Sequence, residues 1–274
     1  MRVTQDHSAR WATRWTGSTM TTTAAFSLAI GGFIHLCLYR HGYRAIPDIG
    51  ALFAANVLAS AAAAAALLLR RDLLVRLAGL SVAAGTLAAF AVSRTGGGLL
   101  HFREVGLLPA PQAAIALAAE AAAFFVLGAT IVWDLPERAS RWVGAAALIG
   151  VAVVHVLDLP NQLHGALYIT AGYVVLIAAS AVLAVRVARG PSSWDWGLAT
   201  IVTAVAVIAY VLSRSVGLPL DSGDIGNWAE PLGIAALLAE GSVLLIATRR
   251  QPLLARSTTP TWSVRRPMHA AGRR

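Results

Sequence analysis

Eight long hydrophobic runs, separated by short polar segments, account for most of the chain. A helix needs about 20 mostly apolar residues to cross roughly 30 Å of hydrocarbon. Runs of suitable composition, two of them short, cover residues 23–39, 51–69, 73–92, 110–132, 142–157, 165–184, 197–212 and 231–247. The pattern predicts an all-α polytopic membrane protein with eight transmembrane helices.

Polar residues interrupt the runs of both halves at a constant spacing of 120 residues. The recurring pairs are His35 and His155, Ser93 and Ser213, Arg94 and Arg214, Pro111 and Pro231, and Glu120 and Glu240. A gapless recurrence in a background of Ala, Leu and Val indicates a tandem duplication of one four-helix unit. Because four spans are an even number, we expect two parallel repeats related by a pseudo-two-fold axis along the membrane normal.

This duplication divides the chain into four predicted segments. Residues 1–22 form a cytoplasmic N-terminal segment, residues 23–132 the first four-helix repeat and residues 142–248 the second. Residues 249–274 are rich in Arg, Pro and Thr, so we expect a basic, disordered cytoplasmic tail.

The composition excludes several classes of protein. Hydrophobic residues make up 57% of the 274 positions and charged residues only 13%, which is too apolar for a soluble domain of this size. The net charge of +9 comes from Arg alone, and these residues lie between hydrophobic runs rather than on a basic face with aromatic residues. Nucleic-acid binding is therefore not expected. Cys37 is the single cysteine, which excludes an intramolecular disulfide and a multi-cysteine metal centre.

The placement of arginine predicts the orientation in the membrane. With the N-terminus in the cytoplasm, 17 of the 22 basic residues are cytoplasmic, and only Arg40, Arg44, Arg94, Arg103 and Arg214 lie outside. This bias follows the positive-inside rule. We expect a protein of the bacterial cytoplasmic membrane with both termini in the cytoplasm and its longer connections on the outer face.

The recurring ionisable residues are predicted to share one depth. At about 1.5 Å per residue, Glu120 and Glu240 lie roughly 13 Å below the outer surface, and His35 and His155 come out near the same level. Ionisable groups at such a depth are costly and usually functional. Equal depth permits either one shared polar site or two symmetric ones.

The glutamates and histidines each leave two interpretations open. Glu120 and Glu240 are either carboxylates that bind a proton or cation, or protonated side chains hydrogen-bonded to a neighbouring helix or to Ser93 or Ser213. His35 and His155 are either metal or haem ligands, or buried hydrogen-bonding residues. Haem would need both imidazoles on one iron near the pseudo-axis.

Copper or zinc is the other metal hypothesis, and it would recruit histidines of the outer loops, namely His41, His101 or His164. No HxxxH or ExxH spacing supports such a site.

Arg94 and Arg214 follow serines at helix ends, where two roles are open. Each either extends to the lipid headgroups or acts as an anion clamp or as a partner of the glutamate below it. The loop before the last span contains Asp221, Asp224 and Glu230, and we expect it to be acidic and solvated. Its spacing is not that of a calcium loop.

The segments HLCLYRHGYRAIPDIGALF and SRTGGGLLHFREVGL, with the glutamate-bearing helix that follows them, resemble a unit found in an uncharacterised family of actinobacterial multi-pass membrane proteins. The segment YVLSRSVGLPLDSGDIGNWAEPLG is similar to the later half of the same unit. The resemblance covers residues 33–247 and implies a membrane location and a four-helix topology, but no particular chemistry. The second half has VLDLPNQLHG in place of the longer LYRHGYRAIPDIG.

These observations lead to three functional hypotheses. The first is binding or transport of a small solute or ion at an outward-facing site between the repeats, which uses Glu120, Glu240, Arg94, Arg214, Ser93 and Ser213. The second is a haem- or metal-binding redox protein that uses His35 and His155. The third is a non-catalytic membrane scaffold or assembly factor. No G-x-S-x-G, phosphate-binding glycine loop or HExxH motif points to an enzyme. The oligomeric state is open.

Overall fold

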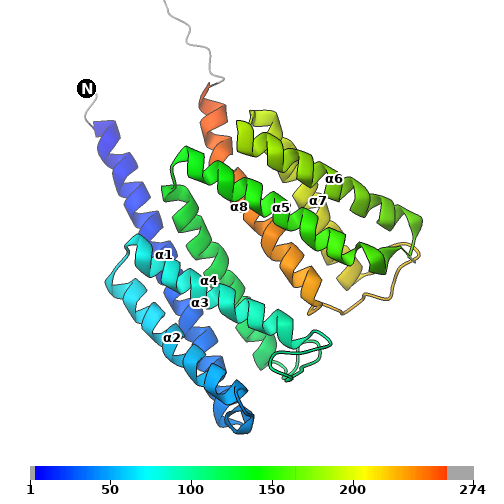
Figure 1. Ribbon diagram of the computed structural model, residues 1–274. Helices are drawn as coiled ribbons and strands as arrows, with labels where there is room; N and C mark the ends of the chain where they lie inside the picture. The colour runs from blue at the N-terminus through cyan, green and yellow to red at the C-terminus, as the bar shows by residue number, and fades with distance from the viewer. Residues whose placement is uncertain (1–3, 164, 258–274) are drawn as a thin grey trace, which may run out of the picture.

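Helices make up the regular structure of residues 4–163 and 165–257, the part of the chain that the computed structural model describes (Figure 1). The α-helices are α1 (Thr4–Arg40), α2 (Ile49–Leu69), α3 (Leu73–Ser93), α4 (Gln112–Asp134), α5 (Glu137–Gln162), α6 (Leu167–Arg189), α7 (Ser193–Ser215) and α8 (Pro231–Ser257). A short 3-10 helix, η1 (Tyr43–Ala45), follows α1. Each of the eight α-helices contains a segment long and apolar enough to cross a membrane. The predicted all-α polytopic fold is confirmed, and its environment is the lipid bilayer.

Local capping explains where several helices begin. The side chain of Asp72 accepts a hydrogen bond from the backbone N–H of Val75 at the start of α3. At the start of α7, Ser192 and Asp195 form a reciprocal capping box. Both arrangements satisfy backbone donors that a helix leaves unpaired in its first turn. Pro231 is the first residue of α8, where its missing N–H removes no hydrogen bond.

Two helix ends extend beyond the predicted spans. Helix α1 begins at Thr4, within the segment predicted to precede the first span, and α8 continues to Ser257, within the predicted tail. The guanidinium group of Arg249 donates hydrogen bonds to the carbonyl oxygens of Val132 and Leu135 at the end of α4. Carbonyl groups at a helix C-terminus lack the full set of backbone donors found within the helix, so Arg249 supplies further donors and joins the end of α4 to α8. Residues 1–3 and 258–274 lie outside the described residues.

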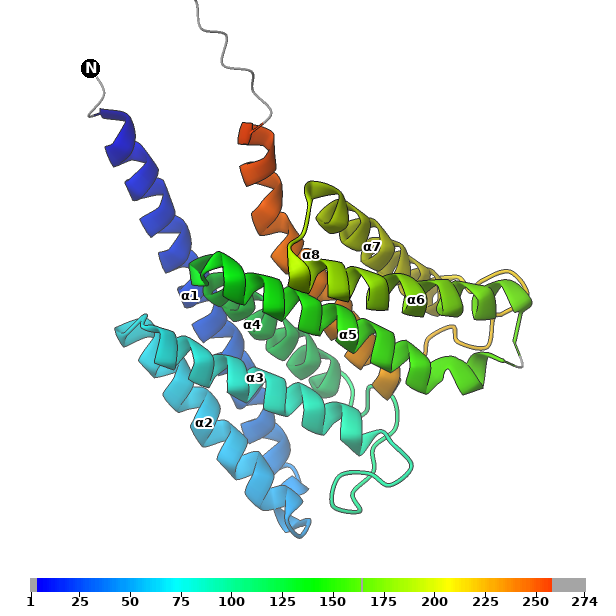
Figure 2. The ribbon, with the colours of Figure 1, turned by 45° about the horizontal axis from the view of Figure 1, so that its top comes forward.

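The helices pack as two bundles of four, which we call the first bundle (α1–α4) and the second bundle (α5–α8). In each bundle the first helix packs along the second and fourth helices, and the third helix packs on the fourth. The second and third helices contact each other less. The bundles meet where α4 and α8 come together, and α3 also contacts α8 (Figure 2). Helices α4 and α8 are therefore internal to the molecule.

Small residues allow the two bundles to approach closely. A Cβ placed on Gly241 of α8 would come within 2.6 Å of the ring of Phe125 on α4. Each bundle also has its own apolar core, which includes Leu28 and Leu127 in the first and Leu148 and Val243 in the second. Close helix contact through small residues is typical of packing within a membrane.

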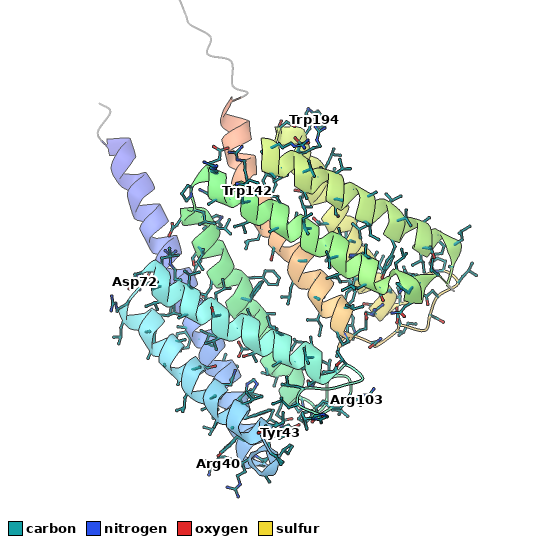
Figure 3. All side chains as sticks on the ribbon, viewed as in Figure 1. Arg40, Tyr43, Asp72, Arg103, Trp142 and Trp194 are labelled. Carbon is teal, nitrogen blue, oxygen red and sulfur yellow. The ribbon has the colours of Figure 1, made fainter. Side chains whose placement is uncertain are left out.

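The two ends of the molecule carry different connections. Trp142 and Trp194 lie at the end where α1 begins and α8 finishes, and Arg40, Tyr43 and Arg103 lie at the opposite end (Figure 3). The long connections 94–111 and 216–230 are at this second end, which we call the loop end. The functional-site residues predicted from the sequence lie toward it.

Candidate functional site

Each bundle encloses a pocket of its own. The first pocket has a volume of about 360 Å³ and is lined by α1–α4 and by the connection 94–111. The second pocket has a volume of about 470 Å³ and is lined by α5–α8 and by the connection 216–230. Neither pocket lies between the bundles. The structure therefore has two separate sites rather than the single shared site of the first functional hypothesis.

The recurring polar residues divide evenly between the two pockets. His35, Ser93, Arg94 and Glu120 line the first pocket. The residues 120 positions later, His155, Ser213, Arg214 and Glu240, line the second pocket. The sequence recurrence thus corresponds to a recurrence in space.

Glu120 and Glu240 are the most deeply buried of these groups. Each residue is only 1% exposed. Both carboxyl oxygens of Glu120 and Oε2 of Glu240 have no hydrogen-bond partner. Ser93 and Ser213 do not supply one, because their hydroxyls donate to the carbonyl oxygens of Phe90 and Tyr210. Each pocket therefore contains an acidic side chain with unused hydrogen-bonding capacity, which is costly in a low dielectric.

The two histidines have the same local geometry. Nδ1 of His35 is 2.8 Å from the carbonyl oxygen of Gly31, and Nδ1 of His155 is 2.9 Å from that of Val151. Since a carbonyl only accepts hydrogen bonds, Nδ1 of each ring is the donor and Nε2 remains for other contacts. Nε2 of His155 lies 3.7 Å from Oε1 of Glu240.

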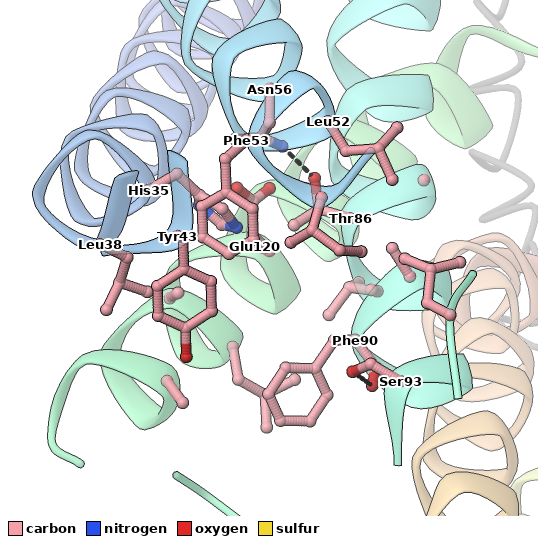
Figure 4. A pocket seen from close by; sticks show the side chains of 18 of the residues that line it. His35, Leu38, Tyr43, Leu52, Phe53, Asn56, Thr86, Phe90, Ser93 and Glu120 are labelled. Atoms are coloured by element: carbon pink, nitrogen blue, oxygen red, sulfur yellow. Dashed lines mark hydrogen bonds between the residues drawn. The ribbon is translucent and has the colours of Figure 1, made fainter. Parts of the chain in front are cut away.

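An aromatic ring packs against each histidine. Phe53 lies beside His35 at 5.2 Å between ring centroids, and Tyr173 lies beside His155 at 5.0 Å. Phe53 and Tyr173 are also 120 positions apart. Figure 4 shows the first pocket, where His35 and Phe53 face the same space as Glu120.

Arg94 and Arg214 hold the long connections against the helices. Arg94 donates hydrogen bonds to the carbonyl oxygens of Gly106 and Leu108 and to the hydroxyl of Ser93. Its guanidinium carbon lies 3.6 Å from the ring centroid of Phe90. These contacts commit most of the guanidinium donors to the protein itself.

Arg214 forms ion pairs in the second bundle. It is 8% exposed, and it bonds Asp224 at 2.5 Å and Glu230 at 2.9 Å. Its Nε donates to the carbonyl oxygen of Asn227. The ionic partners of Arg214 are therefore two loop carboxylates and not Glu240. Asp224 and Glu230 belong to the loop that was expected to be solvated, and both are bound to Arg214.

The pKa values of two ionisable groups at the loop end are shifted by their surroundings. Burial, followed by the negative charge of Asp158, raises the pKa of Glu230 above its usual value despite the opposing effect of Arg214. In the first bundle, burial and the hydrogen bond to Glu104 raise the pKa of Tyr43. The Tyr43 hydroxyl donates to Oε1 of Glu104 at 2.6 Å. Asp158 and Glu230 both line the second pocket.

Both pockets extend to the lipid-facing surface of their bundle. Leu52 and Ala55 of α2 and Ser81 and Gly85 of α3 line the first pocket and are exposed. The second pocket has the same arrangement on α6 and α7, with Gly172, Val175, Ile201 and Val205. Each pocket therefore opens sideways, between the second and third helices of its bundle.

One polar contact spans the opening of the first pocket. The side-chain amide of Asn56 on α2 donates to Thr86 on α3 at 2.6 Å, as Figure 4 shows. The corresponding residues of the second bundle are Leu176 and Ala206, which cannot form this bond. The opening of the larger second pocket is thus not bridged by this hydrogen bond.

The geometry bears on the metal and haem hypotheses. His35 and His155 line different pockets, so they are not placed to bind one iron between them. Among residues 4–163 and 165–257, no three His, Cys, Asp or Glu side chains come together in a way that could hold a metal ion. His164, one of the loop histidines considered for copper or zinc, lies outside the described residues.

Several pocket residues were missed by the sequence reasoning. Asp158 and Tyr173 are prominent in the second pocket, where the Tyr173 hydroxyl donates to Asp158 at 2.7 Å. Asn56 and Thr86 play a comparable part in the first pocket. The spacing of 120 residues between Phe53 and Tyr173 was available in the sequence and would have identified this aromatic pair.

Comparison with known proteins adds no relative, because no protein-family model, no curated protein and no solved structure matches the chain significantly. Its function is therefore inferred from the pockets themselves.

Proposed function

We propose that each bundle binds one small amphipathic solute that enters its pocket from the bilayer. The observation that supports this is the combination, in both bundles, of a lipid-facing opening with a buried carboxyl group that has at least one oxygen without a hydrogen-bond partner. Ligand sites are mostly apolar and contain a few placed polar groups that set orientation. Both pockets have this composition.

The polar end of the solute would bind near the histidine and glutamate. Nδ1 of each imidazole is bonded to the backbone, which leaves Nε2 facing its pocket, and each glutamate has a carboxyl oxygen without a hydrogen-bond partner. A hydroxyl, amine or amide group in this position satisfies atoms that are otherwise costly to bury. The apolar body of the solute would fill the opening between α2 and α3, or between α6 and α7.

Transfer of the solute between the bilayer and the outer face is the activity we assign to these pockets. The long connections close the pockets at the loop end, and Arg94 and Arg214 hold them in place. Glu120 and Glu240 are the groups that exchange a proton or a hydrogen bond with the solute. An ionisable residue within the membrane that faces a cavity commonly marks such a pathway.

Duplication of a four-helix unit and the orientation of the chain are parts of the same proposal. The matched pockets, 120 residues apart in sequence, support duplication. The arginine bias supports a bacterial cytoplasmic membrane in which the loop end faces outward and both termini face the cytoplasm.

Binding of a neutral fluorescent amphiphile tests the proposal. The probe is 4-(4-dimethylaminostyryl)pyridine, titrated into the purified full chain in an uncharged detergent. We expect two saturable sites per chain. Gly85→Trp should remove the first site and Val205→Trp the second, because these residues line corresponding openings. A Cβ added to Gly85 would have no other atom within 4 Å, so the new ring has room to enter the opening.

Matched controls separate pocket binding from surface binding. Leu74→Trp adds the same ring on the lipid-facing surface outside both pockets, so it should leave the stoichiometry unchanged. Glu120→Gln and Glu240→Gln, singly and together, should weaken binding in their own pockets. Unaltered stoichiometry in the Gly85→Trp/Val205→Trp double variant would contradict the proposal.

A further inference from the structure

The second pocket is far more acidic than the first. Five carboxyl side chains line it, namely those of Asp158, Asp221, Asp224, Glu230 and Glu240. Of the acidic residues that the structure describes, only Glu104 and Glu120 line the first pocket. Among the described residues one arginine and one histidine line each pocket, so the two pockets differ in their number of acidic side chains.

Three of these acids have no acidic counterpart in the first bundle. The positions 120 residues before Asp158, Asp221 and Glu230 are occupied by Leu38, His101 and Ala110. The two pockets are therefore alike in shape and in their His–Glu pair but not in charge.

Asp158 adds charge that no cation offsets among the described residues. It is 8% exposed and accepts hydrogen bonds from the side chains of Asn161, Gln162 and Tyr173, all of which are neutral donors. Arg214, the one arginine that lines this pocket among the described residues, is already bound to Asp224 and Glu230. A positive charge that enters the pocket would meet an excess of carboxyl groups.

Glu240 provides an independent indication that a ligand belongs here. It is 1% exposed, it lines the pocket, and its Oε2 has no hydrogen-bond partner. Its other oxygen faces Nε2 of His155 at 3.7 Å. A buried acceptor left open in this way is satisfied by a donor from outside the protein.

Aromatic rings complete a surface suited to an organic cation. Tyr168 and Tyr173 line the second pocket, and so does Tyr210, whose ring already carries the guanidinium group of Arg214. A cation above such a ring is attracted to its negative face, and the attraction is stronger where water is excluded. Among the described residues no three of the carboxyls form a metal-binding cluster, and the rings lie in the same pocket, which favours an organic cation over a metal ion.

From these observations we propose that the second pocket selects a cationic amphipathic molecule, such as an organic ammonium or pyridinium ion, whereas the first pocket takes a neutral one. This inference rests on the proposed function and specifies the solute class of one of its two sites. The apolar body of the cation lies in the opening between α6 and α7. Its charged end lies among Asp158, Glu240 and Tyr173.

A pair of probes that differ by one methyl group tests the selectivity. The neutral probe is 4-(4-dimethylaminostyryl)pyridine and the cationic probe is its N-methylpyridinium form. Both are titrated in an uncharged detergent at about pH 8, where the neutral probe is unprotonated. Gly85→Trp blocks the first pocket and leaves the second open, whereas Val205→Trp blocks the second and leaves the first open. Each pocket is therefore measured alone.

In the Gly85→Trp protein we expect the cation to bind at least about tenfold more tightly than the neutral probe, since one unscreened charge contact in a low dielectric supplies this much. In the Val205→Trp protein the two affinities should agree within about threefold. Adding Asp158→Asn to Gly85→Trp should reduce the preference about tenfold. Asp134→Asn, which changes a carboxylate outside both pockets, should not.

The possible results are distinguishable from one another. Equal affinity of both probes in the Gly85→Trp protein overturns the charge selectivity and leaves the proposed function intact. Absence of saturable binding of either probe in that protein overturns the proposed function itself. If Asp158→Asn does not fold, Glu240→Gln in the same background replaces it, and an unchanged preference in whichever variant folds contradicts the inference.

Discussion

The carboxyl group of Glu120 occupies the space beside the Cα atom of Gly31. A Cβ on Gly31 would overlap Oε1 of Glu120 and would lie 3.0 Å from its Cδ. The corresponding residue of the second bundle is Val151, and there Oε1 of Glu240 lies 3.7 Å from Nε2 of His155. In the first bundle, the absence of a side chain at position 31 thus makes room for the buried acid.

Gly31→Ala should therefore destabilise the protein. The new methyl group must displace a fully buried carboxyl, and overpacking of this kind costs about 1–3 kcal/mol. Gly85→Ala is the matched control, because Gly85 is also within a helix and nothing lies within 4 Å of its added Cβ. We expect it to be neutral or slightly stabilising. Unfolding in mixed micelles of SDS and a mild detergent measures both.

The double variant Gly31→Ala/Glu120→Ala tests the cause. With the long side chain removed, the alanine at position 31 meets no carboxyl, so its cost should fall close to that of Gly85→Ala. An undiminished cost in the Glu120→Ala background would show that the methyl group clashes with something else.

The lengths of the hydrophobic runs and the spacing of 120 residues predicted much of what the structure shows. The eight spans follow from run length alone, and the recurrence identified Glu120, Glu240, His35 and His155 as pocket residues. These features are local or depend only on sequence spacing. They do not require knowledge of which helices are neighbours.

The remaining features depend on tertiary contacts. Arg249 was assigned to a disordered tail because hydropathy marks the edge of the hydrocarbon, whereas the end of α4 gives its side chain carbonyl partners. The partners of Arg214 lie in a loop whose path no periodicity encodes. Whether the ionisable pairs form one site or two depends on the packing of α1 with α4 and of α5 with α8.

The proposed orientation predicts which connections are accessible from outside the cell. In a Cys37→Ser background, Gly97→Cys introduces a thiol into the connection 94–111, and Ser193→Cys introduces one at the opposite end, at the start of α7. A membrane-impermeant maleimide should label position 97 on intact cells and position 193 only after lysis. The reverse pattern would place the long connections in the cytoplasm, and the Cys37→Ser parent shows the background labelling.

The hydrogen bond between Asn56 and Thr86 predicts a coupling across the first opening. Thr86→Ala alone leaves the Asn56 amide without its partner, and the bond is worth about 0.6–1.7 kcal/mol within a membrane. The double variant Asn56→Leu/Thr86→Ala installs the two residues of the second bundle, Leu176 and Ala206, and should recover stability. A double-mutant cycle in mixed micelles measures the coupling energy, and an energy near zero would mean that the bond does not hold α2 to α3.

Arg214 should contribute more to stability than Arg94, although the two residues occupy corresponding positions. Arg214→Ala leaves two partly buried carboxylates, Asp224 and Glu230, without their cation, which we expect to cost about 2–4 kcal/mol. Arg94→Ala removes hydrogen bonds to a hydroxyl and to backbone carbonyls, which should cost about 1–2 kcal/mol. Unfolding in mixed micelles compares the two variants.

The deficit of the Arg214→Ala protein should also depend on pH. Burial and Asp158 raise the pKa of Glu230, so its protonated form stabilises the fold and that contribution is lost as the pH rises through the folded-state pKa. Without Arg214, its lowering effect on the pKa of Glu230 is lost. The loss in free energy of unfolding should therefore grow between about pH 5 and about pH 8. The triple variant Arg214→Gln/Asp224→Asn/Glu230→Gln removes both acids with the cation. The triple variant should therefore be more stable than Arg214→Ala at about pH 8, and its free energy of unfolding should depend less on pH. If Arg214→Ala loses the same free energy of unfolding at both pH values, the ion pairs are not the cause of the loss.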